Sequence, residues 1–227
     1  MTKLRLASYN VHKAVGLDRR RDPARILRVL LEVDADIVAL QEVDKRLGSR
    51  PTALPRFLIR QETDYTVVDL AENDVSLGWH GNAILVRKGL SVSDLRHVDL
   101  PGLEPRGAVM ARIEGLTVVG THLALLRYWR QRQMLAIINH LDGEFSKSAI
   151  LGDFNEWSTT QGFEPLMHDF TVLRPGRSFH AIRPVGELDR IAHGRKVSIR
   201  DHGVHNTALA RIASDHLPVW ADVKFDG

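Results

Sequence analysis

Residues 149–155 read AILGDFN, and residues 214–219 read SDHLPV. In both stretches a short apolar run lies directly beside acidic and amide side chains. Such runs are typical of buried β-strands. Polar residues at a strand end lie at the rim of a sheet, where loops build binding and catalytic sites. These two stretches therefore predict a sheet whose strand ends carry the chemistry of the protein.

The same arrangement occurs at four other places in the chain. Asn10 closes the alternating stretch KLRLASYN, Glu42 follows DIVALQ, and His122 follows LTVVGT. Asp189 lies inside GELDRIA. A single polar residue after a strand is most often a turn residue or a helix cap. The functional interpretation therefore depends on all six places together.

The remaining patterns predict strands and two long helices. Further strands are expected at 65–70, 82–87, 108–113, 116–121, 148–152, 188–192 and 217–225. Asp22-Pro23 is typical of a helix start, and apolar residues follow at helical spacing, namely Ile26, Leu27, Leu30 and Leu31. A second helix is predicted at 127–141, with one apolar side formed by Trp129, Leu135, Ile138 and Leu141.

Consecutive strands favour mixed or antiparallel sheets over a strictly parallel array. Two packed sheets with helices outside fit the number of strands. Residues 154–186 contain three prolines and are expected to form long surface loops. No repeat or linker divides the chain, so we expect a single domain over residues 1–227.

Composition excludes several classes of protein. The 227 residues include no Cys, which excludes a disulfide scaffold, a cysteine-ligated zinc site and a thiol nucleophile. The net charge of +3 is too small to indicate a dedicated duplex-binding protein. The sequence shows no apolar run of membrane-spanning length and no secretory signal pattern, so a cytoplasmic location is expected. It does not indicate an oligomeric state.

Four carboxylates stand among the strand-end residues: Glu42, Asp153, Asp189 and Asp215. Gathered at one rim they would repel one another, and some would be forced to protonate. A hard divalent cation relieves that repulsion. Mg²⁺ prefers oxygen ligands and needs only one or two carboxylates, which leaves the other acids free to handle protons.

Three further side chains complete a chemical set. His122, His216 and Asn155 can donate hydrogen bonds to a phosphoryl oxygen. Metal, base and donors together would support metal-assisted attack of water on a phosphate ester.

The ordered motifs SYN, QE, THL, GDFN, LDRI and SDHLP resemble those of the endonuclease/exonuclease/phosphatase superfamily, which includes DNase I. They reach from residue 8 to residue 218. The closer likeness is to small uncharacterised bacterial members, since HGNAIL at 80–85 and EPRGAV at 104–109 resemble their secondary motifs. The resemblance implies an α/β four-layer sandwich, with two mixed β-sheets packed face to face and helices outside. It also implies metal-dependent cleavage of a phosphoester.

The resemblance also implies a metal site. Glu42 would be the main ligand of Mg²⁺, with Mn²⁺ as the alternative. Asn10 would assist, and Asp215 would lie at or beside the metal. This chain departs from the exonuclease III pattern at His12, where many members carry an acid. That departure weakens the case for abasic-site repair.

The catalytic roles follow from the same motifs. Asp153 would orient and deprotonate the attacking water, and Asn155 would hold the phosphate. His216 would donate to the phosphoryl oxygen and be oriented by Asp189, while His122 would contact the phosphate from another side.

Other residues are weaker candidates. The secondary motifs make three of them candidate pocket residues, namely His80, Asn82 and Arg106. The start of the second helix carries Arg127, Arg130 and Arg132, which could grip a second phosphate, although a solvated helix face is the favoured interpretation.

Three functions remain open from the sequence. The first is a hydrolase of a small or lipid-linked phosphoester. The second is a nuclease acting on DNA or RNA, and the third is a binding module without catalysis. The motifs define the reaction but do not identify the substrate.

Overall fold

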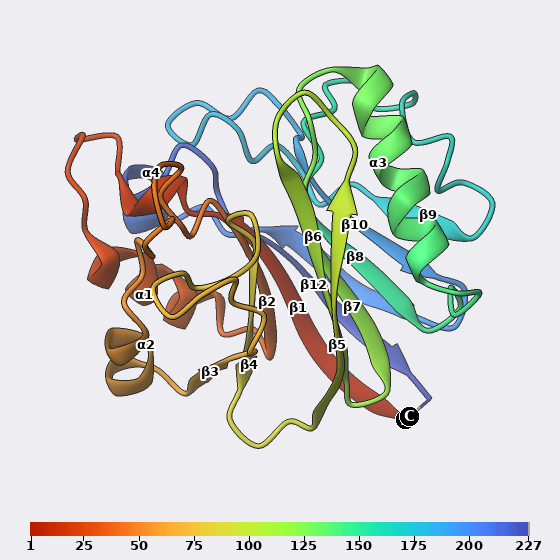
Figure 1. The fold of residues 1–227 in the computed structure, drawn as a ribbon, viewed down its shortest axis with the longest axis horizontal. Helices are drawn as coiled ribbons and strands as arrows, with labels where there is room; N and C mark the ends of the chain where they lie inside the picture. Colours follow the sequence, from red (N-terminus) through yellow and green to blue (C-terminus); the bar gives the residue numbers. More distant parts are fainter. Residues whose placement is uncertain (227) are drawn as a thin grey trace.

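Two six-stranded mixed sheets pack face to face in the computed structural model, which describes residues 1–226 (Figure 1). The first sheet has, in order, β11 (Ser198–Val204), β12 (Val219–Phe225), β1 (Thr2–Asn10), β2 (Ile37–Gln41), β4 (Ala83–Arg87) and β3 (Tyr65–Val67). The second has, in order, β5 (Val92–Leu100), β6 (Arg106–Ile113), β7 (Leu116–His122), β8 (Ser148–Asp153), β10 (Asp189–Gly194) and β9 (Phe170–Leu173). Each sheet contains one parallel pair, β1 with β2 and β7 with β8.

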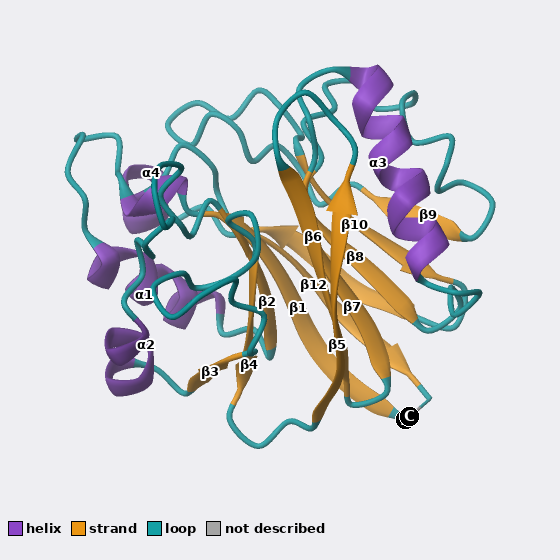
Figure 2. Cartoon of the chain, viewed as in Figure 1, coloured by secondary structure: helices purple, strands orange, loops and turns teal. Residues whose placement is uncertain are grey.

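Helices cover the outer faces of both sheets (Figure 2). The first sheet is covered by α1 (Pro23–Val33), α2 (Arg56–Glu62) and α4 (Ala208–Ala213), and a short 3₁₀ turn, η1 (His12–Ala14), follows β1. The second sheet is covered by α3 (Arg127–His140). This arrangement confirms the predicted four-layer sandwich. Within residues 1–226, no helix combines the length and the apolar character needed to cross a membrane.

Three apolar layers hold the sandwich together. The layer between the two sheets includes Leu6, Ile37 and Leu151. The outer layers lie beneath the helices, with Tyr9 among the residues packed on the α1 side and Ile150 among those on the α3 side. Because side chains alternate along a strand, each inner strand contributes to two layers and reads as an almost continuous apolar run.

The alternation also explains why polar residues converge between the sheets. Leu4 and Leu6 of β1 face the second sheet, and Asn10 has the same parity. Ala149 and Leu151 of β8 face the first sheet, and Asp153 continues that face. The inner apolar layer therefore ends, at one edge, in polar side chains from both sheets.

The errors in the predicted strands concern the four edges of the two sheets. The sequence did not predict β5, β9 or β11, and the strand expected at 65–70 ends at Val67. Residues 154–186 therefore contain one strand, β9, within the expected loops. An edge strand pairs on one side only, and β5 and β11 are largely exposed. Neither strand therefore needs the apolar pattern of a buried strand.

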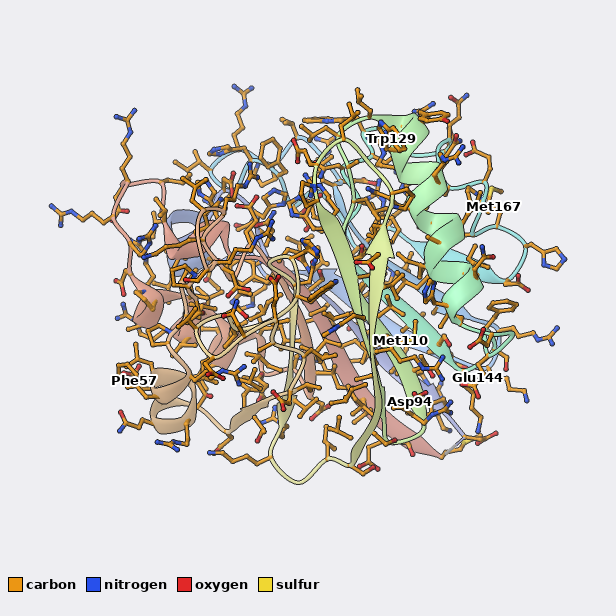
Figure 3. All side chains as sticks on the ribbon, viewed as in Figure 1. Phe57, Asp94, Met110, Trp129, Glu144 and Met167 are labelled. Carbon is orange, nitrogen blue, oxygen red and sulfur yellow. The ribbon has the colours of Figure 1, made fainter. Side chains whose placement is uncertain are left out.

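The predicted apolar sides of the helices need correction. In α3, Leu135 is 49% exposed, whereas Arg130 and Gln133 are buried. Trp129 lies near the beginning of the helix, at the upper end of α3 in Figure 3. In α1 the cap is confirmed, because the Asp22 side chain accepts from the Arg25 amide, but Leu31 is 48% exposed.

Buried polar partners explain the unexpected face of α3. Arg130 donates to Glu156, with 2.6 Å between Nη2 and Oε2, and Arg127 also pairs with Glu156. Gln133 donates to the Pro101 carbonyl and accepts from the Ala124 amide. The interpretation of Arg130 as a solvated helix residue is therefore wrong.

We predict that Glu156→Gln lowers the free energy of unfolding by about 3 kcal/mol, because it leaves the buried Arg130 without a carboxylate. Burial alone would raise the pKa of Glu156, but hydrogen bonds from Arg127, Ser158 and Arg130 outweigh it and lower the pKa from 4.5 to about 2. The stabilisation that the ionised Glu156 gives to the folded state is therefore present above pH 4.5 and lost as the pH falls toward 2.

Urea unfolding of wild type and variant at several pH values measures this difference. The exposed Glu164→Gln on the neighbouring loop is the control and should change stability by less than about 0.5 kcal/mol. A Glu156→Gln variant as stable as the control at neutral pH would contradict the prediction.

Candidate active site

The predicted strand-end residues meet at one edge of the sandwich. His122 of β7 is the register partner of Asp153 of β8, and Asp153 is the partner of Asp189 of β10. β12 runs antiparallel to β1, so its beginning and the preceding His216 lie at the same end as Asn10. Residues from both sheets therefore face one another across the end of the inner apolar layer.

Asp153 lies at the centre of the site. The residue as a whole is only 1% exposed. Its Oδ2 accepts from Asn10 Nδ2 at 3.1 Å and lies 3.4 Å from His122 Nε2 and 3.6 Å from His216 Nε2. Its Oδ1 accepts from the backbone amide of Asn155 at 2.9 Å. Each carboxylate oxygen thus has a polar neighbour, which offsets the cost of burying the charge.

His216 is held in one orientation by Asp189. His216 Nδ1 lies 2.8 Å from Asp189 Oδ2, and that oxygen also accepts from the Ser178 hydroxyl. Burial alone would lower the pKa of His216, but the charges of Asp189 and Asp153 outweigh it and raise the pKa to about 10. The ring of Phe179 packs against His216, with centroids 4.9 Å apart. His216 is therefore a fixed cation at neutral pH.

His122, by contrast, is uncharged at neutral pH. Burial is the largest influence and lowers its pKa to about 4, although Asp153 acts in the other direction. Arg106 adds to the effect of burial and donates from Nη1 to the His122 carbonyl at 3.1 Å. A neutral and a cationic imidazole therefore flank the same carboxylate.

Asn155 is fixed beside Asp153. Its backbone lies in the left-handed region with φ 51°. Its Nδ2 donates to the Leu123 carbonyl at 2.8 Å. Since the side-chain amide nitrogen of asparagine carries two hydrogens, one N–H remains for a ligand.

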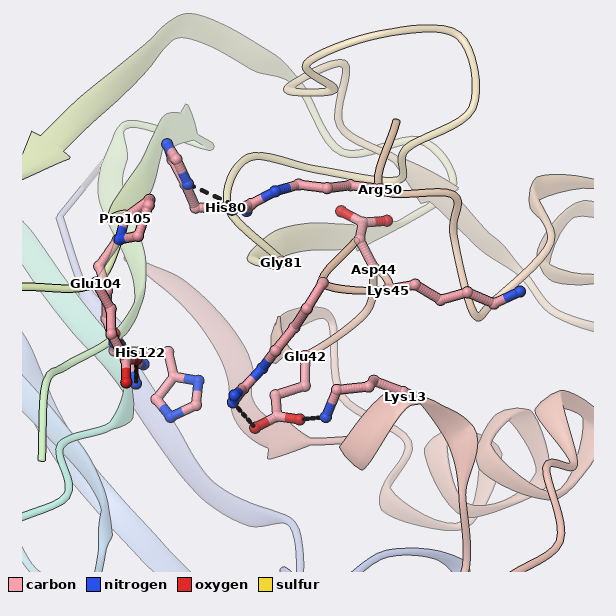
Figure 4. Close-up of a pocket in the computed structure, with 12 residues that line it drawn as sticks. Lys13, Glu42, Asp44, Lys45, Arg50, His80, Gly81, Glu104, Pro105 and His122 are labelled. Atoms are coloured by element: carbon pink, nitrogen blue, oxygen red, sulfur yellow. Dashed lines mark hydrogen bonds and ion pairs between the residues drawn. The ribbon is translucent and has the colours of Figure 1, made fainter. Parts of the chain in front are cut away.

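Glu42 is surrounded by cations (Figure 4). Lys13 Nζ donates to Glu42 Oε2, and Arg46 Nη2 lies 3.6 Å from Oε1. Burial alone would raise the pKa of Glu42, but His122 and Lys13 outweigh it and lower the pKa to about 2. The carboxylate is therefore ionised and available as an oxygen ligand at neutral pH.

The candidate metal cluster consists of residues that the sequence analysis assigned to catalysis, not of the expected metal ligands. Within residues 1–226, the one set of three acidic or imidazole side chains whose ligand atoms lie within 4.8 Å of one another comprises Asp153, Asp189 and His216. Glu42 and Asp215 are not in this set. Asp215 lies close by, because Ser214 Oγ donates to the Asn10 carbonyl at 2.7 Å and lies 3.3 Å from Asp215 Oδ1.

The donor chemistry fits a hard divalent cation. The site offers ionised carboxylates together with the amide oxygen of Asn10, and Mg²⁺ prefers such oxygen ligands. In addition, the buried Asp189 Oδ1 has no hydrogen-bond partner among the described residues.

Backbone strain gathers around the same edge. Non-glycine residues with positive φ cost free energy and cluster at functional sites in proteins. Six of them lie in the segments that form this site, with φ between 46° and 58°: His12, Lys13, Ala14, Glu42, His80 and Asn155.

The weaker candidates are divided between two positions. His80 and Arg106 line a cavity of about 340 Å³ that Glu42 and His122 also line. Asn82 does not line it; its Nδ2 donates to the Gly107 carbonyl at 2.9 Å and links the residue before β4 to strand β6.

Sequence reasoning missed two residues of the site. Ser178 holds Asp189 but lies in an irregular segment without a motif. Lys13 pairs with Glu42, and its position three residues after Asn10 was the only available signal. Ser178 belongs to a loop and Lys13 to the short turn η1, and the apolar pattern determines the course of neither.

Fold and site together define a hydrolase of the DNase I-like type. The model of the "Endonuclease/Exonuclease/phosphatase family" matches residues 7–216. The chain belongs to the endonuclease/exonuclease/phosphatase family, whose members are metal-dependent phosphoester hydrolases.

One curated relative is similar to the chain in sequence, and two solved structures are similar to it in fold. The chain is 28% identical to the "Uncharacterized protein YbhP" of Escherichia coli K12 over 248 residues, covering 96% of this chain and 95% of the relative. A solved family member from Bacteroides vulgatus has a TM-score of 0.78 at 19% identity, covering 100% of both chains. A mannosyl-6-phosphatase from Bacteroides thetaiotaomicron has a TM-score of 0.73 at 17% identity, covering 98% of this chain and 100% of that one.

We predict that Asp189→Asn lowers the pKa of His216 from about 10 toward its ordinary value of 6.5, because the closest negative charge is removed while burial remains. NMR titration of the imidazole signals in EDTA measures this change. The wild-type ring should stay protonated from about pH 6 to 9, and the variant ring should titrate in that interval.

The exposed Asp201→Asn on β11 is the matched control and should leave the His216 titration unchanged. A wild-type His216 that loses its proton near pH 6.5 would show that Asp189 does not govern its charge.

Proposed function

We propose that this protein hydrolyses a phosphoester, as a phosphodiesterase or phosphatase, with Mg²⁺ as cofactor and Mn²⁺ as the alternative. The observation that carries the proposal is the buried Asp153 carboxylate between a neutral His122 and a cationic His216. A base beside two donors of different charge suits proton removal from water and stabilisation of a phosphoryl oxygen.

Each of these side chains takes a separate role. Asp153, oriented by Asn10, accepts the proton of the attacking water. His216, oriented by Asp189, donates to the phosphoryl oxygen. Asn155 contributes its remaining N–H to the same group, and His122 binds the phosphate from the other side.

Glu42, Asn10 and Asp215 would hold the metal. When bound, a divalent cation acts as a Lewis acid that stabilises charge on the phosphoryl oxygens. Glu42 is suited to this role because its low pKa keeps it ionised.

A small or lipid-linked substrate is favoured by the size of the adjoining cavity. About 340 Å³ lies at the lower end of the range for small-molecule sites.

The cytoplasmic location expected from the sequence stays a prediction, as does the single domain over residues 1–227.

A nuclease remains the second candidate because of an aromatic pair next to the catalytic histidine. Trp157 is 60% exposed and makes an edge contact with Phe179 at 5.9 Å between centroids. Phe179 in turn packs on His216. An exposed ring of this kind could stack on a nucleic acid base.

We predict that Asp153→Asn reduces turnover of bis(4-nitrophenyl) phosphate about 10²–10⁴-fold, because the base that accepts the proton is lost. Release of 4-nitrophenol with Mg²⁺ or Mn²⁺ measures the rate, and EDTA should abolish it. Asp201→Asn, on the exposed strand β11, is the control and should retain wild-type turnover. Full activity in EDTA would refute the proposed function.

The nuclease alternative makes a different prediction. Binding of plasmid DNA should then weaken steeply with salt: the logarithm of the binding constant should fall with the logarithm of the salt concentration with a slope of about 0.9 per neutralised phosphate. Trp157→Ala should weaken binding of single strands by about 1–3 kcal/mol per stacked base. No cleavage of plasmid DNA or RNA, together with turnover of small esters, would exclude this alternative.

A further inference from the structure

A cationic cavity adjoins the proposed catalytic residues. Its lining includes five cationic side chains, namely Lys13, Lys45, Arg46, Arg50 and Arg106. It includes three acidic ones, namely Glu42, Asp44 and Glu104, so the cations exceed the acids by two. Glu42 and His122 belong to the active site and also line the cavity (Figure 4). A ligand in the cavity can therefore extend into the active site.

Arg50 is a cation of this cavity without an acidic partner. Lys13 and Arg46 pair with Glu42, and Arg106 pairs with Glu104. By contrast, no carboxylate oxygen among residues 1–226 lies within 4.0 Å of the Arg50 guanidinium.

Asp44, whose charge interacts with that of Arg50 without an ion pair, is already engaged. Asp44 is buried and accepts from the Leu77 amide at 2.7 Å and the Gly78 amide at 3.3 Å. Its carboxylate therefore braces the neighbouring loop and does not form an ion pair with Arg50.

The fold holds the Arg50 guanidinium in place through His80. Arg50 Nη1 lies 3.1 Å from His80 Nδ1. Burial and the charge of Arg50 lower the pKa of His80, so the ring is neutral and accepts the hydrogen bond. The loop that carries Arg50 is closed at its base, where the Lys45 amide donates to the Pro51 carbonyl at 3.0 Å.

We propose that this cavity is a subsite for a second phosphate group of the substrate, bound by Arg50 with assistance from Arg46. The proposal rests on the proposed function, since it makes the substrate a phosphoester that carries an additional phosphomonoester. The guanidinium fork binds phosphate oxygens in pairs. The excess of two positive charges matches the charge of about −1.5 to −2 that a phosphomonoester carries at pH 7.

Calorimetric binding of two probes to the full chain in Mg²⁺ tests the subsite. The probes are butyl phosphate and butane-1,4-diyl bisphosphate, with the propane and hexane bisphosphates added to vary the spacing. At the best spacing, the bisphosphate should bind wild type about tenfold or more tightly than butyl phosphate, the gain expected of a charged hydrogen bond.

Arg50→Ala should remove most of that ratio, and Arg50→Lys should keep part of it, because the charge remains while the fork is lost. His80→Ala should give an intermediate ratio. Arg28→Ala, on the exposed face of α1, is the control and should retain the wild-type ratio. Thermal unfolding of each variant confirms that it is folded, and Arg50→Lys replaces Arg50→Ala as the deciding variant if the latter unfolds.

Two results would overturn the subsite: equal binding of the mono- and bisphosphates by wild type at every spacing, or an undiminished ratio in the deciding variant. Each titration is also assayed for released inorganic phosphate, so that the heat of binding is read separately from turnover. A failure to hydrolyse bis(4-nitrophenyl) phosphate therefore counts against the proposed function, whereas loss of the bisphosphate advantage counts against the subsite alone.

Discussion

The burial of the Asp153 carboxylate is the constraint on which the arrangement of the site depends. A buried charge is costly unless it is paired and hydrogen-bonded. Its neighbours come from both sheets: Asn10 from β1, His122 from β7, and His216 from the segment before β12. The two sheets must therefore keep their relative position for the carboxylate to stay satisfied, and the same contacts that hold the edge of the sandwich assemble the site.

The two histidines differ because their outer partners differ. His216 faces Asp189, whose negative charge stabilises the imidazolium. For His122, burial is the largest influence on the pKa, and Arg106, whose guanidinium donates to the His122 carbonyl, adds to it against the charges of Asp153 and Glu42. One scaffold thus places a charged and an uncharged donor about equally far from one base. This difference depends on residues behind the histidines, in β10 and β6, rather than on the histidines themselves.

The sequence predicted the interior strands and the residues at their ends, because an inner strand buried on both faces must be apolar until it reaches the polar edge. It failed at the edge strands such as β5 and β11, where exposure removes that requirement. It also failed at Arg130, whose burial depends on an ion pair with Glu156, 26 residues away in the chain. Lys13 and Ser178 were missed for a similar reason, since no local pattern marks their partners, which lie 29 and 11 residues away in the chain. Apolar periodicity reports burial of hydrophobic groups and carries no information on buried polar pairs.

Charge is distributed unevenly across the site, and that distribution favours one orientation of an anionic ligand. Asp153, Asp189 and Asp215 lie on the side of β8, β10 and β12, where a bound cation would be needed to admit a phosphate. The cavity on the other side of Glu42 has an excess of cations without requiring a metal. A ligand with two phosphates would therefore place one at the acidic side only with the cation present, and could bind the other through arginine alone. Because the electrostatic conditions for the two positions differ, the fold can distinguish the reacting phosphate from one that serves for binding.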